Sequence, residues 1–437
     1  MSNCIAETLE IKDENIIWEN RVERFSNGYI TAKCYFGTLT YTPNHCENCG
    51  FPNENHRIVK NGKRQILIKV PKVSEVPTYI SLKKQRFLCR QCHSTFVAQS
   101  EIVDKHCVIS NNTKKIILNK SVQDRSVKSI SESTNTSFHT VTRIINEAAK
   151  EIAQTPSKSL PEHIMIDELK TVNGQMSMVY CDGLTHQFGD IIESRKKRFV
   201  LDYFYHFSLE ERKKVKTVSI DMFEAYIYMI QELFPNARII IDRFHIVQSI
   251  NREINTARIR LMNEVRYTDH RFYNKLKRHW KIFLTDTENL ESFVYGPVKL
   301  FDKWMTPQGV LDYMLEGNDL LKFTHQVGHQ LRRALKLNQS EKFFSCIKDE
   351  TSISKGLNRV LNTFDKFSPH IMNTFNFPHL SNGPIEGFNN KIKVQKRIAY
   401  GYRNFENFKC RIIVKERLFK KTKRKPRLKK SDFHLVA

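Results

Sequence analysis

Between residues 162 and 250, short apolar runs alternate with amphipathic stretches in a fixed order. The runs at 162–167, 175–180 and 188–193 predict three strands in succession. An amphipathic helix that contains Phe199 and Phe204 follows, and the runs at 216–221 and 237–242 predict two more strands, each with a helix after it. Three strands followed by helix, strand, helix, strand and helix is the order of the ribonuclease-H-like α/β fold.

Acidic residues stand at the ends of three of these predicted strands. Asp167 ends the first strand, Asp221 the fourth and Asp242 the fifth, and Glu386 falls in the first turn of a predicted helix at 381–393. Two such aspartates and the glutamate can converge on two Mg²⁺ or Mn²⁺ ions, because hard divalent cations need several anionic oxygens. An acid at a strand end is more often structural, so the order of strands and helices is what favours a catalytic site.

Two Cys-x-x-Cys pairs lie at 46–49 and 89–92, with β-rich runs at 57–60, 65–70 and 77–81 between them. We expect no signal peptide, and cytosolic thiols stay reduced, so paired cysteines favour a metal over disulfides. The pattern predicts a zinc ribbon over 41–105 in which four thiolates hold one structural Zn²⁺. The ligands would be Cys46, Cys49, Cys89 and Cys92. The long gap between the pairs leaves His45, His56 and His93 as substitute ligands, and four unrelated cysteines as the alternative.

Residues 106–155 predict a helix-turn-helix that binds DNA. Helices are expected at 112–120, 127–134 and 138–148, with a turn at 135–136 and Ser137 as the N-cap of the last helix. The apolar residues 141, 144 and 145 would face inward, while His139, Thr140 and Arg143 would face the major groove. Three packed helices without a role in DNA binding are the alternative.

The remaining segments complete the expected domain organisation. Residues 1–40 carry few distinctive features, and 162–250 form the first part of the catalytic core after a linker at 155–161. Residues 251–380 predict helices and no strand, which indicates an all-helical insertion. The final helix of the core is expected at 381–412, and a basic tail at 413–437.

The charge of the chain favours a polyanionic partner. Lys and Arg number 71 against 46 Asp and Glu, a formal net charge of +25. About half of this excess lies in the last 52 residues, and the basic cluster at 420–430 reads as a phosphate-binding arm or as a solvated, disordered end. No apolar run is long enough to span a membrane. We expect a bacterial protein of the cytoplasm, associated with the nucleoid.

Several motifs recur together in one known family. They are the two Cys-x-x-Cys pairs, Ile166-Asp-Glu168, Ser219-Ile-Asp-Met-Phe-Glu-Ala-Tyr226, Ile241-Asp-Arg-Phe-His245, Ser381-Asn-Gly-Pro-Ile-Glu-Gly-Phe-Asn-Asn-Lys-Ile-Lys393 and Arg397-Ile-Ala-Tyr-Gly-Tyr-Arg-Asn-Phe405. Over nearly its whole length the chain resembles the insertion-sequence transposases of the ISL3 family. The Asp-Arg-Phe-His element and the Ser-Asn-Gly helix are specific when they occur together.

The resemblance implies Asp167, Asp221 and Glu386 as a DDE catalytic triad, with a helical insertion before the glutamate as in the Mutator-like and hAT groups. Asp242 is the rival for the second acid. Asp221 is preferred because Asp242 and His245 stand at i and i+3, which resembles the Cys/Asp-x-x-His element near the active site of related transposases. His245 can donate a hydrogen bond to the scissile phosphate or to a displaced nucleotide. An aspartate cap that holds a buried histidine is the alternative.

The expected function is therefore that of a DNA transposase. The ribbon and the helix-turn-helix would bind terminal inverted repeats, with further DNA contacts from Lys391, Lys393 and Arg397. The catalytic domain would hydrolyse one strand at each end, and the freed 3′-hydroxyl would attack target DNA. Synapsis of two ends requires a homodimer or a higher oligomer. A catalytically inert DNA-binding regulator and a structure-specific nuclease of the same fold are the alternatives.

Overall fold

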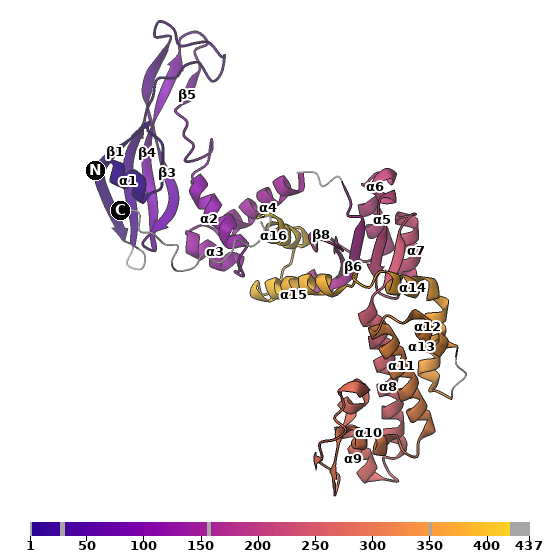
Figure 1. Ribbon diagram of the computed structural model, residues 1–437. Coiled ribbons are helices and arrows are strands. Elements are labelled where there is room, and N and C mark those ends of the chain that lie inside the picture. The colour runs from indigo at the N-terminus through magenta and orange to yellow at the C-terminus, as the bar shows by residue number, and fades with distance from the viewer. Residues whose placement is uncertain (1, 27–30, 155–158, 349–351, 420–437) are drawn as a thin grey trace, which may run out of the picture. The chain divides into compact units, whose positions relative to one another are not determined.

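A computed structural model of the chain describes residues 2–26, 31–154, 159–348 and 352–419. The chain divides into two compact units, whose elements are labelled in Figure 1. The first unit comprises Met1–Pro156 and Lys391–Ala437, and the second comprises Ser157–Asn390. The predicted basic arm at 420–430 and most of the linker at 155–161 lie outside the described residues.

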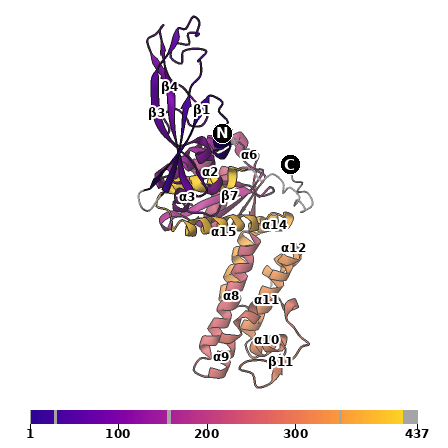
Figure 2. The same cartoon turned by 90° about the vertical axis from the view of Figure 1, so that its left-hand side faces the viewer.

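The first unit contains a five-stranded sheet in the order β1-β2-β4-β3, with β5 paired to β4. Helix α1 and the strands span α1 Ser2–Thr8, β1 Ile16–Ser26, β2 Thr31–Leu39, β3 Ile58–Val73, β4 Val76–Cys89 and β5 Thr95–Val97. Strands β3 and β4 form a long antiparallel hairpin (Figure 2), while β2 runs parallel to β4. The core of the sheet is apolar and includes fully buried Leu39, Ile68, Ile80 and Leu82.

Two features of this sheet differ from the sequence prediction. Strands β1 and β2 lie in the segment 1–40, for which the sequence predicts no strand. Strand β1 is mostly exposed beyond Trp18, so it lacks the sustained apolar alternation that would predict a strand. The runs predicted as separate strands at 57–60 and 65–70 belong to the single strand β3. The polar residues between them include Gly62, at φ 72°, where the pairing with β4 shifts register between Lys60 and Lys63.

Helices α2, α3 and α4 follow the sheet and span Asn111–Ser121, Val127–Thr134 and Phe138–Gln154. Asn135 adopts a left-handed conformation at φ 50° in the turn after α3, and Ser137 Oγ accepts a hydrogen bond from the Thr140 backbone at 3.2 Å. Val141, Ile144 and Ile145 are buried. The structure therefore contains the three predicted helices, with the last one longer than expected.

Helix α16 (Phe405–Arg417) packs against α4 and α2, so it belongs to the first unit. The buried guanidinium of Arg411 donates hydrogen bonds to the carbonyl oxygens of Gln123 (3.3 Å) and Arg125 (2.8 Å), in the loop before α3. The expected final core segment at 381–412 is thus divided between the two units, because α16 buries its side chains against α4 and α2.

The second unit is built on a five-stranded sheet in the order β10-β9-β6-β7-β8. Its strands span β6 His163–Lys170, β7 Met176–Asp182, β8 Phe188–Ile192, β9 Thr217–Ile220 and β10 Arg238–Ile241. Strand β7 is antiparallel to both β6 and β8, whereas β6, β9 and β10 are parallel. Every residue of β9 is buried, as expected for a central parallel strand. The helices among and after these strands are α5 Lys197–Tyr205, α6 Leu209–Lys213, α7 Glu224–Leu233 and α8 Arg243–Glu264.

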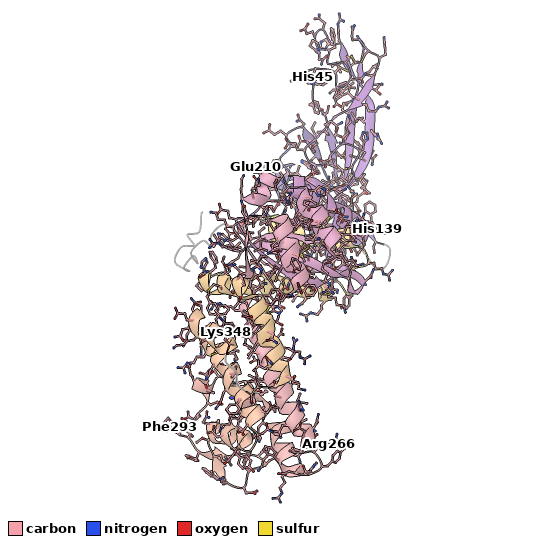
Figure 3. All side chains as sticks on the ribbon, turned by 90° about the vertical axis from the view of Figure 1, so that its right-hand side faces the viewer. His45, His139, Glu210, Arg266, Phe293 and Lys348 are labelled. Atoms are coloured by element: carbon pink, nitrogen blue, oxygen red, sulfur yellow. The ribbon has the colours of Figure 1, made fainter. Side chains whose placement is uncertain are left out.

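Residues 265–376 of the second unit are mostly helical. The helices are α9 His270–Arg278, α10 Pro307–Leu315, α11 Asp319–Lys336, α12 Ser340–Ile347, α13 Lys355–Lys366 and α14 Ser368–Asn376, joined by short 3₁₀ turns. Helix α8 leaves the sheet and packs against α11 and α13, and Figure 3 labels Arg266 and Phe293 at the end of this segment away from the sheet. The expectation of no strand here was wrong, because Gly296–Pro297 (β11) pairs with Trp304–Met305 (β12).

Helix α14 returns the chain to the sheet beside β10. Thr374 Oγ1 donates a hydrogen bond of 2.7 Å to the carbonyl oxygen of Ile241, and Asn373 Nδ2 donates one of 2.9 Å to that of Ile239. Helix α15 (Gly383–Ile398) begins a few residues later. In the part of the chain that the structure describes, no helix is long and apolar enough to cross a membrane.

Candidate active site and metal centre

The four predicted zinc ligands meet in the first unit. One sulfur atom from each of Cys46, Cys49, Cys89 and Cys92 lies within 4.8 Å of the others. The Sγ atoms of Cys46 and Cys92 are 3.7 Å apart, and those of Cys49 and Cys89 are 3.9 Å apart. A tetrahedral zinc ion with Zn–S bonds of about 2.3 Å places its sulfur ligands about 3.8 Å apart. The thiols therefore have the spacing that zinc requires, with no need for the alternative histidine ligands.

Asp167, Asp221 and Asp242 lie in a row across three parallel strands. Asp221 directly follows β9 and Asp242 directly follows β10. The β9–β10 pairing aligns residue 220 with 241, and the β6–β9 pairing aligns 165 with 219, so continuing both registers brings all three aspartates level. Level residues on neighbouring strands are about 5 Å apart and point to the same face of a sheet. Asp167 itself lies within β6, which continues to Lys170, rather than at the end of the strand as predicted.

Burial and mutual repulsion act on the carboxylates of this row. Burial, with a further contribution from the charge of Asp221, raises the pKa of Asp167 to about 6. Burial also raises the pKa of Asp242, whose side chain is only 5% exposed. A row of crowded, partly desolvated carboxylates is stabilised by a cation. The arrangement therefore fits a hard divalent metal ion.

His245, in the first turn of α8, lies beside this row. Its Nε2 atom is 2.8 Å from Oδ1 of Asp221, and this contact is the main reason that the pKa of His245 is raised. The sequence prediction had instead paired His245 with Asp242, because the two residues are three positions apart. In the structure Asp242 accepts a hydrogen bond of 3.3 Å from the backbone N–H of Asn382.

Two buried asparagines connect α15 to the aspartate row. Asn389 Nδ2 donates a hydrogen bond of 2.6 Å to Oδ2 of Asp167. Asn382 Nδ2 donates one of 3.3 Å to the carbonyl oxygen of Ile166, the residue before that aspartate. Asn389 is 3% exposed and Asn382 is 6% exposed, and within the described residues neither Oδ1 atom has a hydrogen-bond partner. We refer to this pair as the asparagine clamp.

The clamp was missed by sequence reasoning, although both residues lie in the quoted motif at 381–393. Asparagine carries no charge, and Glu386 is the only acidic residue of that motif, so the pattern points to the acid alone. Glu386 lies between the two residues of the clamp, four residues after Asn382 and three before Asn389. These spacings place the three side chains on one face of the helix.

Glu386 is exposed in the first turn of α15. Among the described residues, the four cysteines are the only group of three or more Cys, His, Asp or Glu residues whose ligand atoms all lie within 4.8 Å of one another. The carboxylates of Asp167, Asp221 and Glu386 therefore do not converge to that distance. The structure brings together Asp167, Asp221, Asp242 and His245, and the triad remains a prediction.

The predicted DNA contacts lie on helix surfaces. His139 and Arg143 are exposed on α4, and Arg143 forms an ion pair of 2.9 Å with Glu147. Thr140 is half-buried beside Ser137. The side chains predicted on α15 are also exposed, namely Lys391, Lys393 and Arg397.

Comparisons with known proteins address the family. The family model of the ISL3 transposases, described as "Transposase", matches residues 164–412, which is more than half of the chain. A second model, the zinc finger of the transposases of IS204, IS1001, IS1096 and IS1165, matches residues 42–92. The transposase for insertion sequence element IS1001 of Bordetella parapertussis is 24% identical over 377 residues, which cover 84% of this chain and 87% of that protein.

A second relative carries a different name. A protein of Lactococcus lactis subsp. lactis named "ATP-dependent protease" is 31% identical over 169 residues, or 38% of this chain, and the match spans 53% of the length of that protein. The family assignment rests on the ISL3 model over residues 164–412, which cover the aspartate row, and on the IS1001 match over 84% of the chain. The zinc-finger model adds the segment that contains the cysteine pairs. These matches confirm the resemblance inferred from the sequence motifs: the chain belongs to the ISL3 family of transposases.

Proposed function

We propose that this protein is a DNA transposase that cleaves DNA at the ends of its insertion sequence and joins the freed 3′ ends to target DNA. The observation that supports this function is the row of aspartates at one edge of the second sheet, with α15 attached to it by the asparagine clamp. The sheet and its helices have the strand order of a ribonuclease-H-like fold, and we assign it to that fold.

The proposed metal ligands are Asp167, Asp221 and Glu386, which would hold two Mg²⁺ or Mn²⁺ ions. The donors present fit such ions, because hard cations take carboxylate and amide oxygens, and the clamp adds two buried Oδ1 atoms without partners. Bound divalent cations neutralise charge on the attacking and leaving oxygens of the phosphodiester. The residues of the chain orient these ligands, and Asn389 fixes the carboxylate of Asp167 through the 2.6 Å hydrogen bond.

His245 has a different proposed role. Contact with Asp221 raises its pKa and so favours the protonated imidazole. A protonated His245 places a positive charge beside the aspartate row, where it can attract the scissile phosphate or a displaced nucleotide. Asp242 lies at the same edge and positions the start of α15 through the backbone of Asn382.

DNA recognition is assigned to the first unit. We propose that α3 and α4 form the helix-turn-helix, with His139, Thr140 and Arg143 facing the bases of the inverted repeat. Lys391, Lys393, Arg397 and the basic residues after 419 would contact phosphates, and two copies of the chain would pair the two ends of the element. One structural Zn²⁺ on the four cysteines would stabilise the ribbon.

The test uses amide variants that keep the shape of each acid and remove its charge. Asp167→Asn, Asp221→Asn and Glu386→Gln are each expected to abolish cleavage and strand transfer of a labelled repeat-end duplex in Mg²⁺. Duplex binding should remain. Asp242→Asn should reduce the rate only in part, because it acts through the start of α15. Glu232→Gln is the matched control, since Glu232 lies in the last turn of α7 and pairs with Lys197 at 2.7 Å.

Three outcomes would change the assignment. Full activity in Asp221→Asn with none in Asp242→Asn would exchange the second acid. Activity in Glu386→Gln would remove the triad. Cleavage by the unaltered protein without any joined product would favour a nuclease, and sequence-specific binding without cleavage would favour a regulator.

A further inference from the structure

A basic pocket lies on the β3–β4 hairpin of the first unit. It has a volume of about 580 Å³ and is bounded by the two strands, β5 and the loop at 104–108. Its basic side chains are Lys63, Arg64, Lys84, Arg86 and Lys105. The zinc ligands do not line this pocket, and nothing in the proposed function has used its lysines and arginines.

Lys84 is the unusual member of the pocket. This residue is only 6% exposed, and no ion pair or hydrogen bond of its side chain is found among the described residues. Burial, followed by the charge of Arg64, lowers the pKa of Lys84. The ammonium nitrogen of Lys84 is not among the buried unpartnered atoms and so reaches the pocket, but a lysine residue this deeply buried without an acidic partner is uncommon.

The strand register also places like charges together. Arg64 on β3 is directly opposite Lys84 on β4, and Arg86 is two residues further along β4, so its side chain projects from the same face. Like charges that face each other across an antiparallel pair destabilise the sheet. The hairpin therefore holds several cations in an arrangement that the folded protein alone does not favour.

The two acids that line the pocket neutralise only one of its five cations, Lys105. Glu47 forms an ion pair of 3.4 Å with Lys105. Asp104 is bonded to the ammonium of Lys114, outside the pocket, and accepts a hydrogen bond of 3.0 Å from Asn111 Nδ2. In the described part of the chain, Lys63, Arg64, Lys84 and Arg86 are left without an acidic partner.

We propose that this pocket binds a phosphate group of the DNA backbone, with Lys84 and Arg64 as its main ligands. The inference rests on the proposed function in one respect, namely that DNA is the source of the phosphate. The pocket contributes affinity without reading sequence, since phosphate contacts fix the position of a protein on a duplex and bases specify the site. A bound phosphate offsets the repulsion between the two opposed cations and supplies the counter-charge that Lys84 lacks.

The experiment compares three full-length variants in duplex binding at several salt concentrations. Lys84→Met and Arg64→Met remove one pocket charge each. Lys83→Met is the matched control, because Lys83 points to the opposite face of β4 and pairs with Glu19 at 3.2 Å. Each pocket variant should lower the slope of log affinity against log salt by about one, and weaken binding to any duplex roughly fivefold to tenfold at about 0.1 M salt. Lys83→Met should keep the slope of the unaltered protein.

Stability measurements separate a ligand-binding role from a structural one. Without DNA, Lys84→Met and Arg64→Met should unfold at an equal or higher temperature than the unaltered protein, because each relieves the opposed charges, and both should keep their zinc. Lower thermal midpoints for both variants, with an unchanged salt slope, would mean that the cations stabilise the fold and would overturn the proposal.

Inorganic phosphate provides the last comparison. At matched ionic strength, phosphate should raise the thermal midpoint of the unaltered protein more than chloride does, and Lys84→Met should lose this difference. If phosphate acts through Lys84 while duplex binding is unchanged by both pocket variants, the pocket binds a free anion and the DNA assignment is wrong. If the unaltered protein binds no duplex at all, the proposed function fails instead, whatever phosphate does.

Discussion

The substitution Asp167→Asn should stabilise the second unit at neutral pH in the absence of divalent cations. The folded environment raises the pKa of Asp167 from 3.8 to about 6, a shift of roughly two pKa units. At about 1.4 kcal/mol per unit, keeping this carboxylate ionised costs the folded state about 3 kcal/mol above pH 6. Asparagine avoids that cost, but it has a single acceptor oxygen where the carboxylate accepts from both Asn389 and the Glu168 backbone. The lost hydrogen bond costs about 1 kcal/mol, so the net gain is about 2 kcal/mol.

The gain should depend on pH in a defined direction. Because the folded pKa lies above the unfolded one, the folded state binds more protons between pH 3.8 and about 6, and the unaltered protein loses stability as the pH rises through that window. The variant lacks this titration. Its advantage should therefore be largest above pH 6 and mostly absent near pH 4. Added Mg²⁺ should reverse the order at neutral pH, since it stabilises only a protein that retains the charged ligand.

The assay is urea unfolding followed by hydrogen exchange in peptides from β6 and β9, which reports the second unit alone. Mg²⁺ is removed by dialysis, because a chelator would also extract zinc from the first unit. Asp202→Asn is the control, as Asp202 is an exposed carboxylate on α5. If Asp167→Asn is no more stable than the unaltered protein at pH 7.5, or if its gain is the same at pH 4, the proposed cost of the buried, crowded carboxylate of Asp167 is wrong.

Three further predictions concern the zinc site, the clamp and the proposed DNA-recognition role of helix α4. Purified protein should contain about one zinc per chain by elemental analysis, and Cys89→Ser should lose it while Cys107→Ser, outside the cluster, keeps it. Asn389→Leu should weaken Mn²⁺ binding, measured by titration calorimetry, and slow repeat-end cleavage at least tenfold. The control Asn390→Leu, at an exposed position of the same helix, should change neither quantity. Equal effects of the two variants would contradict a positioning role for Asn389. Arg143→Ala should lower the preference for repeat ends over random duplex in competition binding, and a uniform loss on both DNAs would assign Arg143 to the backbone instead.

Local sequence patterns predicted much of what positions the site. The apolar runs that become β7 and β8, and those that become β9 and β10 together with Asp221 and Asp242 at their ends, follow from hydrophobic periodicity within a few residues. The two Cys-x-x-Cys turns are equally local, since each turn places its own two thiolates. The resemblance to the ISL3 family rests on such short motifs, and the family match confirms it.

The tertiary structure decided which of these segments meet. Asp167 and Asp221 are level because β6 pairs with β9. His245 contacts Asp221, and not only Asp242, its neighbour in sequence, because the pairing of β10 with β9 brings the start of α8 level with Asp221. The contact between Asn389 and Asp167 joins residues 222 positions apart. Periodicity specifies which face of an element is apolar, but strand register and helix packing are set by contacts summed over distant segments. The position of buried Lys84 directly opposite Arg64, like the aspartate row, is therefore seen only in the folded chain.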